Sequence, residues 1–131
     1  MTHALFIYGT LMPGLRLEAE MHGARFIGAA KVPGRLVDVG RYPGFLPGDG
    51  LVTGEVYEVD DAHLARLDEV EAMVPGDRAA SQYWRELVTV VDGPLKGQQL
   101  QTYVYNRPVE GCTPIPHGDY RRYIREVGRE S

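Results

Sequence analysis

Glycine and proline recur along the whole chain and limit the kind of fold that it can adopt. Sixteen glycines and nine prolines are spread over 131 residues and are not gathered in one linker. Both residues interrupt regular elements and form tight turns, so this distribution predicts short strands joined by sharp turns. No repeat, low-complexity segment or change of composition divides the chain, and we expect a single domain spanning residues 1–131.

Charge and hydropathy argue against several classes of protein. The net charge is −4 and there is no basic block, which disfavours a nucleic-acid surface. No apolar run approaches the roughly 20 residues needed to cross a membrane, and the first residues lack the pattern of a signal peptide. Cys112 is the single cysteine, which suits a reducing compartment. We therefore expect a cytoplasmic protein without nucleic-acid or membrane partners.

Local patterns predict more strands than helices. Strand-forming runs lie at residues 5–8, 25–32, 35–39, 51–59, 83–91 and 98–105, with turns at 33–34 and 40–50. Helical patterns lie at 13–23, at 62–73 after a capping Asp60 or Asp61, and at 119–128, where Asp119 caps a face of Tyr120, Tyr123, Ile124 and Val127. Short turns favour antiparallel pairing, so we expect a largely antiparallel or mixed sheet, closed or strongly curved, with helices packed against it.

The stretch from Leu5 to Gly14 combines a buried-strand pattern with an abrupt end. Leu5 to Tyr8 are strand formers that are apolar on both faces, and Gly9, Pro13 and Gly14 then turn the chain into a tight loop. A buried strand that ends in such a loop, with free backbone N–H groups, can hold a small anion. The same stretch also fits a first core strand with its turn, so its role depends on a partner elsewhere in the chain.

A carboxylate interrupts the apolar face of the helix expected at residues 62–73. Leu64 and Leu67 set that face, and Glu71 projects between them. Burial raises the pKa of a carboxyl group towards neutrality, as a general acid or base requires. Two structural alternatives stay open: the helix unwinds and exposes Glu71, or Glu71 forms an ion pair with Arg85.

Other candidate residues carry weaker signals. The four histidines are scattered without metal-ligand spacing, and Cys112 lacks a paired histidine or a helix N-terminus. Alternation places Tyr83 and Arg85 on one face of their strand, where each suits either a site or the core. Tyr105 has the same two interpretations, at a cavity mouth or in the core.

Five short motifs occur in order along the chain. They are Tyr8-Gly9-Thr10-Leu11, Gly40-Arg41-Tyr42-Pro43-Gly44, Gly54-Glu55-Val56-Tyr57, Leu67-Asp68-Glu69-Val70-Glu71-Ala72 and Tyr83-Trp84-Arg85. Their order and spacing, to about Tyr105, resemble the gamma-glutamylcyclotransferase-like superfamily. That family has Tyr-Gly-Ser/Thr-Leu, Gly-x-Tyr-Pro-Gly, Gly-x-Val/Leu-Tyr, Leu-Asp-x-aromatic-Glu-Gly and Tyr-x-Arg at these places.

The resemblance implies a fold and a chemistry. The fold is α+β: a small mixed, mostly antiparallel β-barrel flanked by short helices, with a cavity at one end. The chemistry is intramolecular aminolysis of a gamma-glutamyl compound, which releases 5-oxoproline and a free amine or amino acid. The resemblance makes Glu71 the general acid/base and Tyr8, Gly9, Thr10 and Leu11 the substrate-binding loop, with no metal or cofactor.

Three departures from the family pattern accompany the resemblance. Val70 replaces an aromatic residue, Ala72 replaces a glycine, and the interval from Glu71 to Tyr83 is long. Because alanine reaches positive φ less readily than glycine, we expect the loop after Glu71 to run differently. These departures motivate a second hypothesis, a non-catalytic domain that keeps the cavity and binds a small acidic metabolite. A third is a structural domain in which Glu71 is exposed or ion-paired.

Overall fold

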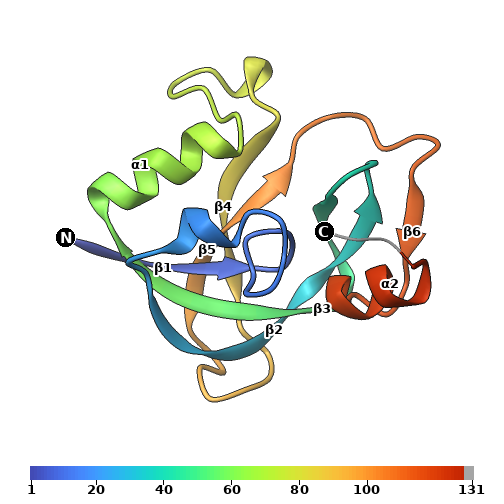
Figure 1. Ribbon diagram of the computed structural model, residues 1–131, viewed down its shortest axis with the longest axis horizontal. Coiled ribbons are helices and arrows are strands. Elements are labelled where there is room, and N and C mark those ends of the chain that lie inside the picture. Colours follow the sequence, from blue (N-terminus) through green and yellow to red (C-terminus); the bar gives the residue numbers. More distant parts are fainter. Residues whose placement is uncertain (129–131) are drawn as a thin grey trace.

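One mixed sheet of six strands dominates the computed structural model, which describes residues 1–128 (Figure 1). The strands are β1 (Thr2–Ile7), β2 (Arg25–Asp38), β3 (Pro43–Asp60), β4 (Tyr83–Thr89), β5 (Gln99–Tyr105) and β6 (Thr113–Ile115). The helices are α1 (Asp61–Val70) and α2 (Tyr120–Glu126), with short 3-10 helices η1 (Glu18–Met21) and η2 (Arg78–Ala80). The sheet order is β4-β5-β1-β3-β2-β6, and β1 with β5 is the parallel pair.

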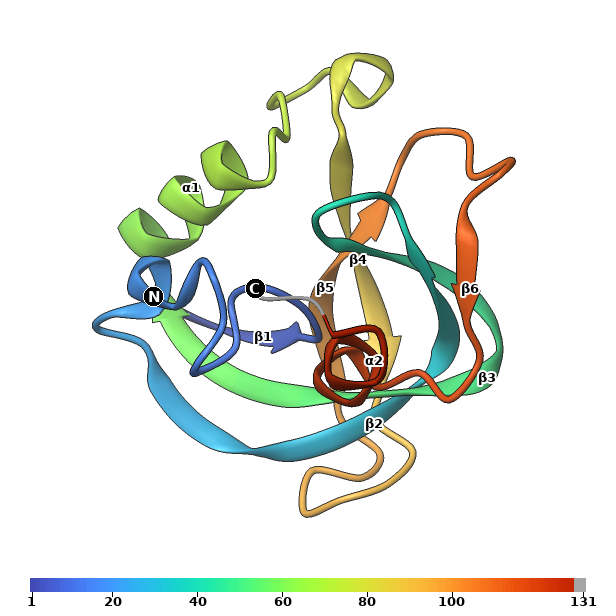
Figure 2. The same cartoon turned by 45° about the vertical axis from the view of Figure 1, so that its right-hand side comes forward.

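The sheet curls because β2 and β3 form one long, bent hairpin (Figures 1 and 2). The register shifts between Phe26 and Gly28 and between Pro33 and Arg35, and such bulges bend a strand pair. A bridge between Lys31 and Asp92 ties the segment after β4 to β2. The result is a curled half-barrel, so the predicted α+β class with a small, mixed, mostly antiparallel barrel is confirmed.

The turns predicted inside this hairpin are partly wrong. Pro33 and Gly34 do not turn the chain back but lie in the bulge of β2, where proline needs no ladder hydrogen bond. Strand β3 begins at Pro43, so the predicted connection at 40–50 is reduced to a short turn closed by the bond from Val39 N to Tyr42 O, 3.1 Å. Strand pairing over the bulge therefore overrides the local turn signals.

The helices are shorter than the sequence patterns predict. The segment 13–23 is helical only over η1, α1 ends at Val70 instead of Met73, and Val127 lies beyond α2 and is exposed. The predicted caps are present, because Asp60 accepts a hydrogen bond from His63 N and Asp119 accepts one from Arg122 N. Strand β6 has no counterpart in the sequence patterns.

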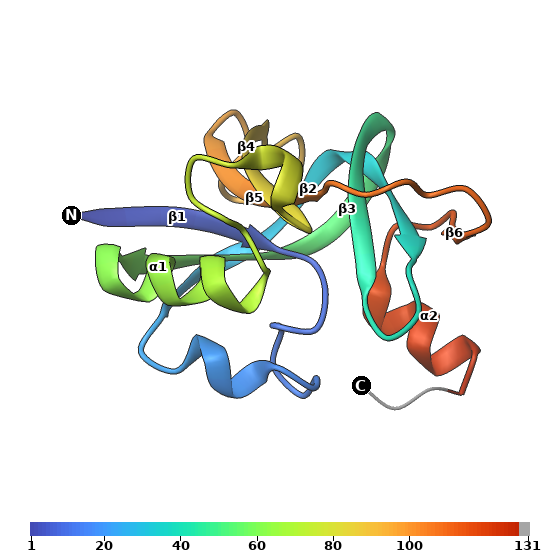
Figure 3. The same cartoon turned by 90° about the horizontal axis from the view of Figure 1, so that it is seen from above.

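The two α-helices lie towards opposite ends of the molecule (Figure 3). Helix α1 lies beside β1 and buries Leu64 and Leu67, whereas α2 buries Tyr120 and Ile124. Neither helix, within residues 1–128, has the length and apolar character needed to cross a membrane. The fully buried side chains of the core include Leu5, Phe6, Leu36, Phe45, Val52, Val56, Leu67, Leu100, Ile115 and Tyr120.

Candidate active site

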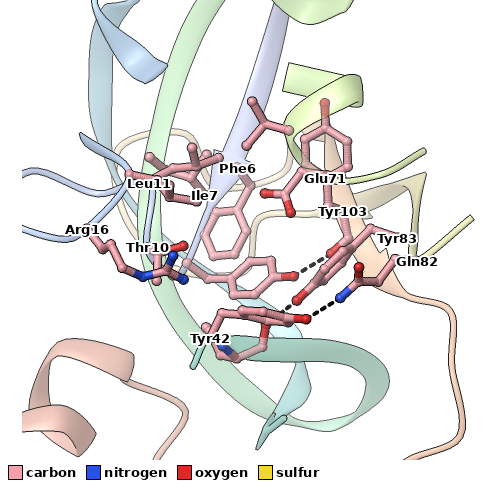
Figure 4. Close-up of a pocket in the computed structure, with 15 residues that line it drawn as sticks. Phe6, Ile7, Thr10, Leu11, Arg16, Tyr42, Glu71, Gln82, Tyr83 and Tyr103 are labelled. Carbon is pink, nitrogen blue, oxygen red and sulfur yellow. Dashed lines mark hydrogen bonds between the residues drawn. The ribbon is translucent and has the colours of Figure 1, made fainter. Parts of the chain in front are cut away.

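A cavity of about 240 Å³ opens where β1 ends, α1 ends and β4 begins (Figure 4). This volume lies below the roughly 300–1,000 Å³ of sites for drug-sized ligands and suits a small metabolite. All five residues proposed from the sequence for the site line this one cavity. The lining residues are Phe6, Ile7, Tyr8, Gly9, Thr10, Leu11, Arg16, Leu17, Tyr42, Pro43, Val70, Glu71, Gln82, Tyr83 and Tyr103.

The loop after β1 is fixed by its own backbone and by close packing. Met12 N donates to Gly9 O at 3.0 Å, and Leu17 N donates to Thr10 O at 2.8 Å. A Cβ on Gly9 would lie 2.7 Å from Cγ of Pro43, so only glycine allows the loop to approach the β2–β3 turn this closely. The carbonyl oxygens of Gly9 and Thr10 are therefore paired within this segment.

The N–H groups of Gly9, Thr10 and Leu11 have no hydrogen-bond partner among residues 1–128, although all three residues are buried. The Thr10 hydroxyl also lacks a partner in this described part of the chain. Buried donors are nearly always paired in folded proteins, so unpaired donors that line a cavity indicate a place for an acceptor. The loop therefore has the donor set of a small-anion site.

Glu71 is held at the end of α1 by a Schellman motif. Glu71 is the C-cap, Ala72 N donates to Glu69 O at 3.0 Å, and Met73 N donates to Asp68 O at 2.8 Å. Ala72 adopts φ of +54°, the left-handed conformation that a glycine takes at this position. The expectation that replacing glycine would redirect this loop is therefore wrong at Ala72.

The Glu71 carboxylate points into the cavity, towards the rings of Phe6 and Tyr83 (Figure 4). Its side chain is half-buried, and it makes no hydrogen bond or ion pair within residues 1–128. Desolvation raises the pKa of Glu71 from 4.5 to about 7. The helix does end before Glu71, as one alternative required, but its end turns the carboxylate inwards instead of into solvent.

Arg85 does not pair with Glu71. Its Nε donates to Asp68 Oδ1 at 2.8 Å and its Nη2 donates to Asp68 Oδ2 at 3.1 Å. The Tyr103 hydroxyl also donates to Asp68 Oδ1, at 2.6 Å. Arg85 is therefore paired with Asp68, and the ion pair with Glu71 that the sequence left open does not form.

Three tyrosines frame the carboxylate, but their hydroxyl groups are engaged. Tyr8 donates to Tyr103 O at 2.6 Å, Tyr83 donates to Pro43 O at 2.7 Å, and Tyr103 donates to Asp68. Burial raises the pKa of Tyr8 and Tyr83 well above the ordinary value, and the nearby Glu71 charge adds to it. These side chains stay neutral and form walls.

Sequence reasoning missed several lining residues, among them Arg16, Tyr42 and Gln82. Gln82 Nε2 donates to the Tyr42 hydroxyl at the cavity edge, and Arg16 reaches the cavity from the segment after the loop. Tyr42 lies within the motif Gly40–Gly44, and Gln82 directly precedes the motif that begins at Tyr83. No sequence pattern pointed to Arg16 as a site residue. Tyr105 is not a lining residue, since its ring packs edge-on against Tyr83.

Within the described residues, no group of three or more His, Cys, Asp or Glu side chains could hold a metal ion. His3 is bonded to Asp61 Oδ1 at 2.5 Å, and His63 Nε2 lies 2.8 Å from Glu20 O. These two histidines therefore serve local structure away from the cavity.

A protein-family model described as "Gamma-glutamyl cyclotransferase, AIG2-like" matches residues 5–122. The chain belongs to this family. The matched range includes the loop after β1 and Glu71. The resemblance drawn from the five motifs is thereby confirmed at the level of the family.

Relatives within the gamma-glutamyl cyclotransferase family cover most of the chain. The family protein YtfP of Escherichia coli K12 is 34% identical over 117 residues, which cover 88% of this chain and 94% of that protein. The gamma-L-glutamyl-butirosin B gamma-glutamyl cyclotransferase of Niallia circulans is 40% identical over 110 residues, covering 79% and 67%. The crystal structure of an AIG2-like protein from Mus musculus has a TM-score of 0.76 at 28% identity, covering 99% and 95%.

Proposed function

We propose that this protein is a cofactor-independent gamma-glutamyl cyclotransferase that releases 5-oxoproline from a small gamma-glutamyl compound. One observation carries the proposal. The carboxylate of Glu71 and the N–H groups of Gly9, Thr10 and Leu11, all unpaired within residues 1–128, line the same cavity. Family membership supports it, and so does the relative from Niallia circulans, which is named as a cyclotransferase for a gamma-glutamyl compound.

Glu71 supplies the proton transfer in this proposal. A base with a pKa of about 7 accepts a proton and returns it readily near neutral pH, as the transfer from the substrate α-ammonium group and then to the leaving nitrogen requires. The deprotonated α-amino nitrogen attacks the γ-carbonyl carbon, forming the ring C–N bond. The bond from that carbon to the leaving nitrogen then breaks, and Glu71 returns its proton to that nitrogen. The second proton that the ring nitrogen loses also passes to the leaving nitrogen, so the amine departs as an ammonium group and the lactam is neutral. No water, metal or oxidant is consumed.

The loop after β1 supplies binding and charge stabilisation. The glutamyl group carries an α-carboxylate and a γ-carbonyl oxygen, both of which accept hydrogen bonds. The N–H groups of Gly9, Thr10 and Leu11 and the Thr10 hydroxyl are donors fixed in advance of the reaction. Because the ring closure is intramolecular, folding the substrate against this loop supplies much of the rate enhancement.

The test measures 5-oxoproline released from a panel of gamma-glutamyl amino acids and amines. We expect wild-type turnover and a loss of at least about 100-fold in Glu71→Gln, the lower end of the range for one acid–base group. Glu69→Gln is the matched control, because Glu69 is an exposed carboxylate two residues away on α1 and does not line the cavity. Saturable binding without product in the wild type would instead support a non-catalytic binding domain. Equal turnover of wild type and Glu71→Gln would refute the role of Glu71.

A further inference from the structure

Arg16 gives the cavity a cationic side. Among the lining residues that the structure describes, Arg16 carries the only positive charge and Glu71 the only negative charge. The two side chains lie on opposite sides of the cavity, with the ring of Phe6 between them (Figure 4). The cavity is therefore electrically polarised from one side to the other.

Arg16 has no carboxylate partner within residues 1–128. Its Nη2 donates to the backbone oxygen of Arg41 at 3.4 Å, which is a weak and neutral contact. Glu18, the acidic residue nearest in sequence, accepts from Gly14 N and does not line the cavity. Most of the donor capacity of the guanidinium is therefore available to a ligand.

The positions of Arg16 and Glu71 fix the direction in which a substrate lies. In the proposed reaction the glutamyl α-amino group must reach Glu71, which is half-buried, and the glutamyl oxygens meet the loop donors. The leaving group then extends towards solvent. Arg16 is exposed and lies on the side away from Glu71.

We propose that Arg16 is a specificity-determining residue that favours leaving groups with a carboxylate and disfavours cationic ones. The inference rests on the proposed function and names its substrate class: gamma-glutamyl amino acids over gamma-glutamyl amines that keep a second ammonium group. A planar guanidinium binds a carboxylate with paired hydrogen bonds, and it repels an ammonium group at the same place. Arg16 contributes binding and takes no part in the proton transfer.

The experiment compares three substrates of similar size whose leaving groups differ in charge. Gamma-glutamyl-L-alanine carries a carboxylate, gamma-glutamyl-L-alaninamide is neutral, and gamma-glutamyl-1,2-diaminoethane carries an ammonium group. We expect wild-type kcat/KM to favour the alanine compound over the amide by about fivefold, the size of a solvent-exposed charge-assisted contact. Added salt should reduce this ratio because the contact is exposed.

Variants locate the preference at Arg16. In Arg16→Gln the ratio of the alanine compound to the amide should fall to about one, and in Arg16→Glu the diamine compound should become the preferred substrate. Arg35→Gln is the matched control, because Arg35 is also exposed and without a carboxylate partner in the described chain, and it does not line the cavity. An unchanged ratio in Arg16→Gln, or a wild type that prefers the amide, would overturn the inference.

Calorimetric binding separates this inference from the proposed function. If no substrate yields 5-oxoproline, the proposed function fails. The affinities of wild type and Arg16→Gln for the same three compounds then still decide the role of Arg16. Tighter binding of the alanine compound that disappears in Arg16→Gln supports it, and equal binding of all three compounds to the wild type overturns it.

Discussion

Arg85 is bonded through two nitrogens to Asp68, and Glu71 is left without a cationic partner in the described part of the chain. The Nε to Oδ1 and Nη2 to Oδ2 distances are 2.8 and 3.1 Å, and the side chains are 24% and 11% exposed. A partner cation would lower the pKa of Glu71, whereas desolvation without one raises it to about 7. Because Arg85 is held by Asp68, it does not offset the burial that raises the pKa of Glu71.

Replacing Asp68 with asparagine should disturb both stability and the pH profile. Removing one partner from a mostly buried ion pair leaves an uncompensated charge, and we expect Asp68→Asn to destabilise the protein by about 2–3 kcal/mol in urea unfolding. The released Arg85 charge favours the ionised form of Glu71, so the acid limb of kcat/KM against pH should move to lower pH.

Glu86→Gln is the control for the Asp68 prediction. It breaks the ion pair between Arg78 and Glu86, whose side chains are 53% and 35% exposed. Glu86 directly follows Arg85 in the sequence. Such pairs contribute less than about 1 kcal/mol, and the pH profile should not move. An Asp68→Asn variant with an unshifted acid limb would show that Arg85 does not influence Glu71.

Glu71→Gln should stabilise the protein above neutral pH while it abolishes activity. The pKa of Glu71 is raised from 4.5 in the unfolded chain to about 7 in the fold, so the native state binds more protons between these values. The contribution of Glu71 to stability is therefore fully present below pH 4.5 and is lost as the pH rises through 7. Glutamine does not ionise, so the Glu71→Gln variant keeps this contribution to stability at high pH.

Urea unfolding at pH 4, 6 and 8 measures this difference. Since Glu71 is partly open to solvent, we expect Glu71→Gln to exceed the wild type by about 1–2 kcal/mol at pH 8 and by little at pH 4. The Glu69→Gln variant, on the exposed face of α1, should follow the wild type at all three pH values. A pH-independent difference for Glu71→Gln would mean that the carboxylate titrates normally.

The sequence indicated the site better than it indicated the sheet. The loop at Tyr8–Leu11 and the inward position of Glu71 follow from local chemistry and helical periodicity, and both segments line the cavity. The bulge at Pro33 could not be predicted, because long-range pairing with β3 at Leu51 decides it and the local signal favours a turn. Strand β6 is three residues long and exists only through its pairing with β2.

The missed lining residues have a common physical reason. Arg16, Tyr42 and Gln82 come from three segments without regular periodicity, and their approach to the cavity depends on tertiary packing. The choice of Arg85 between Asp68 and Glu71 likewise depends on distances of a few ångströms between β4 and α1. Spacing along the chain does not encode such distances.

Ala72 offers a test of backbone strain beside the site. Alanine at φ of +54° is disfavoured by roughly 1–2 kcal/mol, partly offset by the entropy that glycine loses on folding. We expect Ala72→Gly to stabilise the protein by about 0.5–1 kcal/mol in thermal or urea unfolding. The same substitution at Ala65, exposed in the middle of α1, should cost about 1 kcal/mol. Destabilisation in both variants would contradict the left-handed conformation of Ala72.

Thr10 and Thr102 allow a comparison of two buried hydroxyl groups. We expect the Thr10 hydroxyl to bind the substrate and the Thr102 hydroxyl to stabilise the fold. Both residues are buried, but the Thr10 hydroxyl has no partner in residues 1–128, whereas Thr102 Oγ1 donates to Phe6 O at 3.0 Å. Valine has the shape of threonine without the hydroxyl. Thr10→Val should therefore leave the free energy of unfolding unchanged or raise it by up to about 1 kcal/mol, because no protein hydrogen bond is lost.

The activities of the two variants should differ in the opposite direction from their stabilities, with the larger loss of kcat/KM in Thr10→Val. We expect Thr10→Val to reduce kcat/KM for gamma-glutamyl substrates by about tenfold, the effect of losing one substrate hydrogen bond of about 1.4 kcal/mol. Thr102→Val should lose about 1–2 kcal/mol of stability, because it removes the buried hydrogen bond to the Phe6 carbonyl, and should keep its kcat/KM well below its unfolding temperature. If Thr10→Val instead lost stability and kept its activity, the hydroxyl would belong to the fold, and the donors that bind the substrate would be the backbone N–H groups alone.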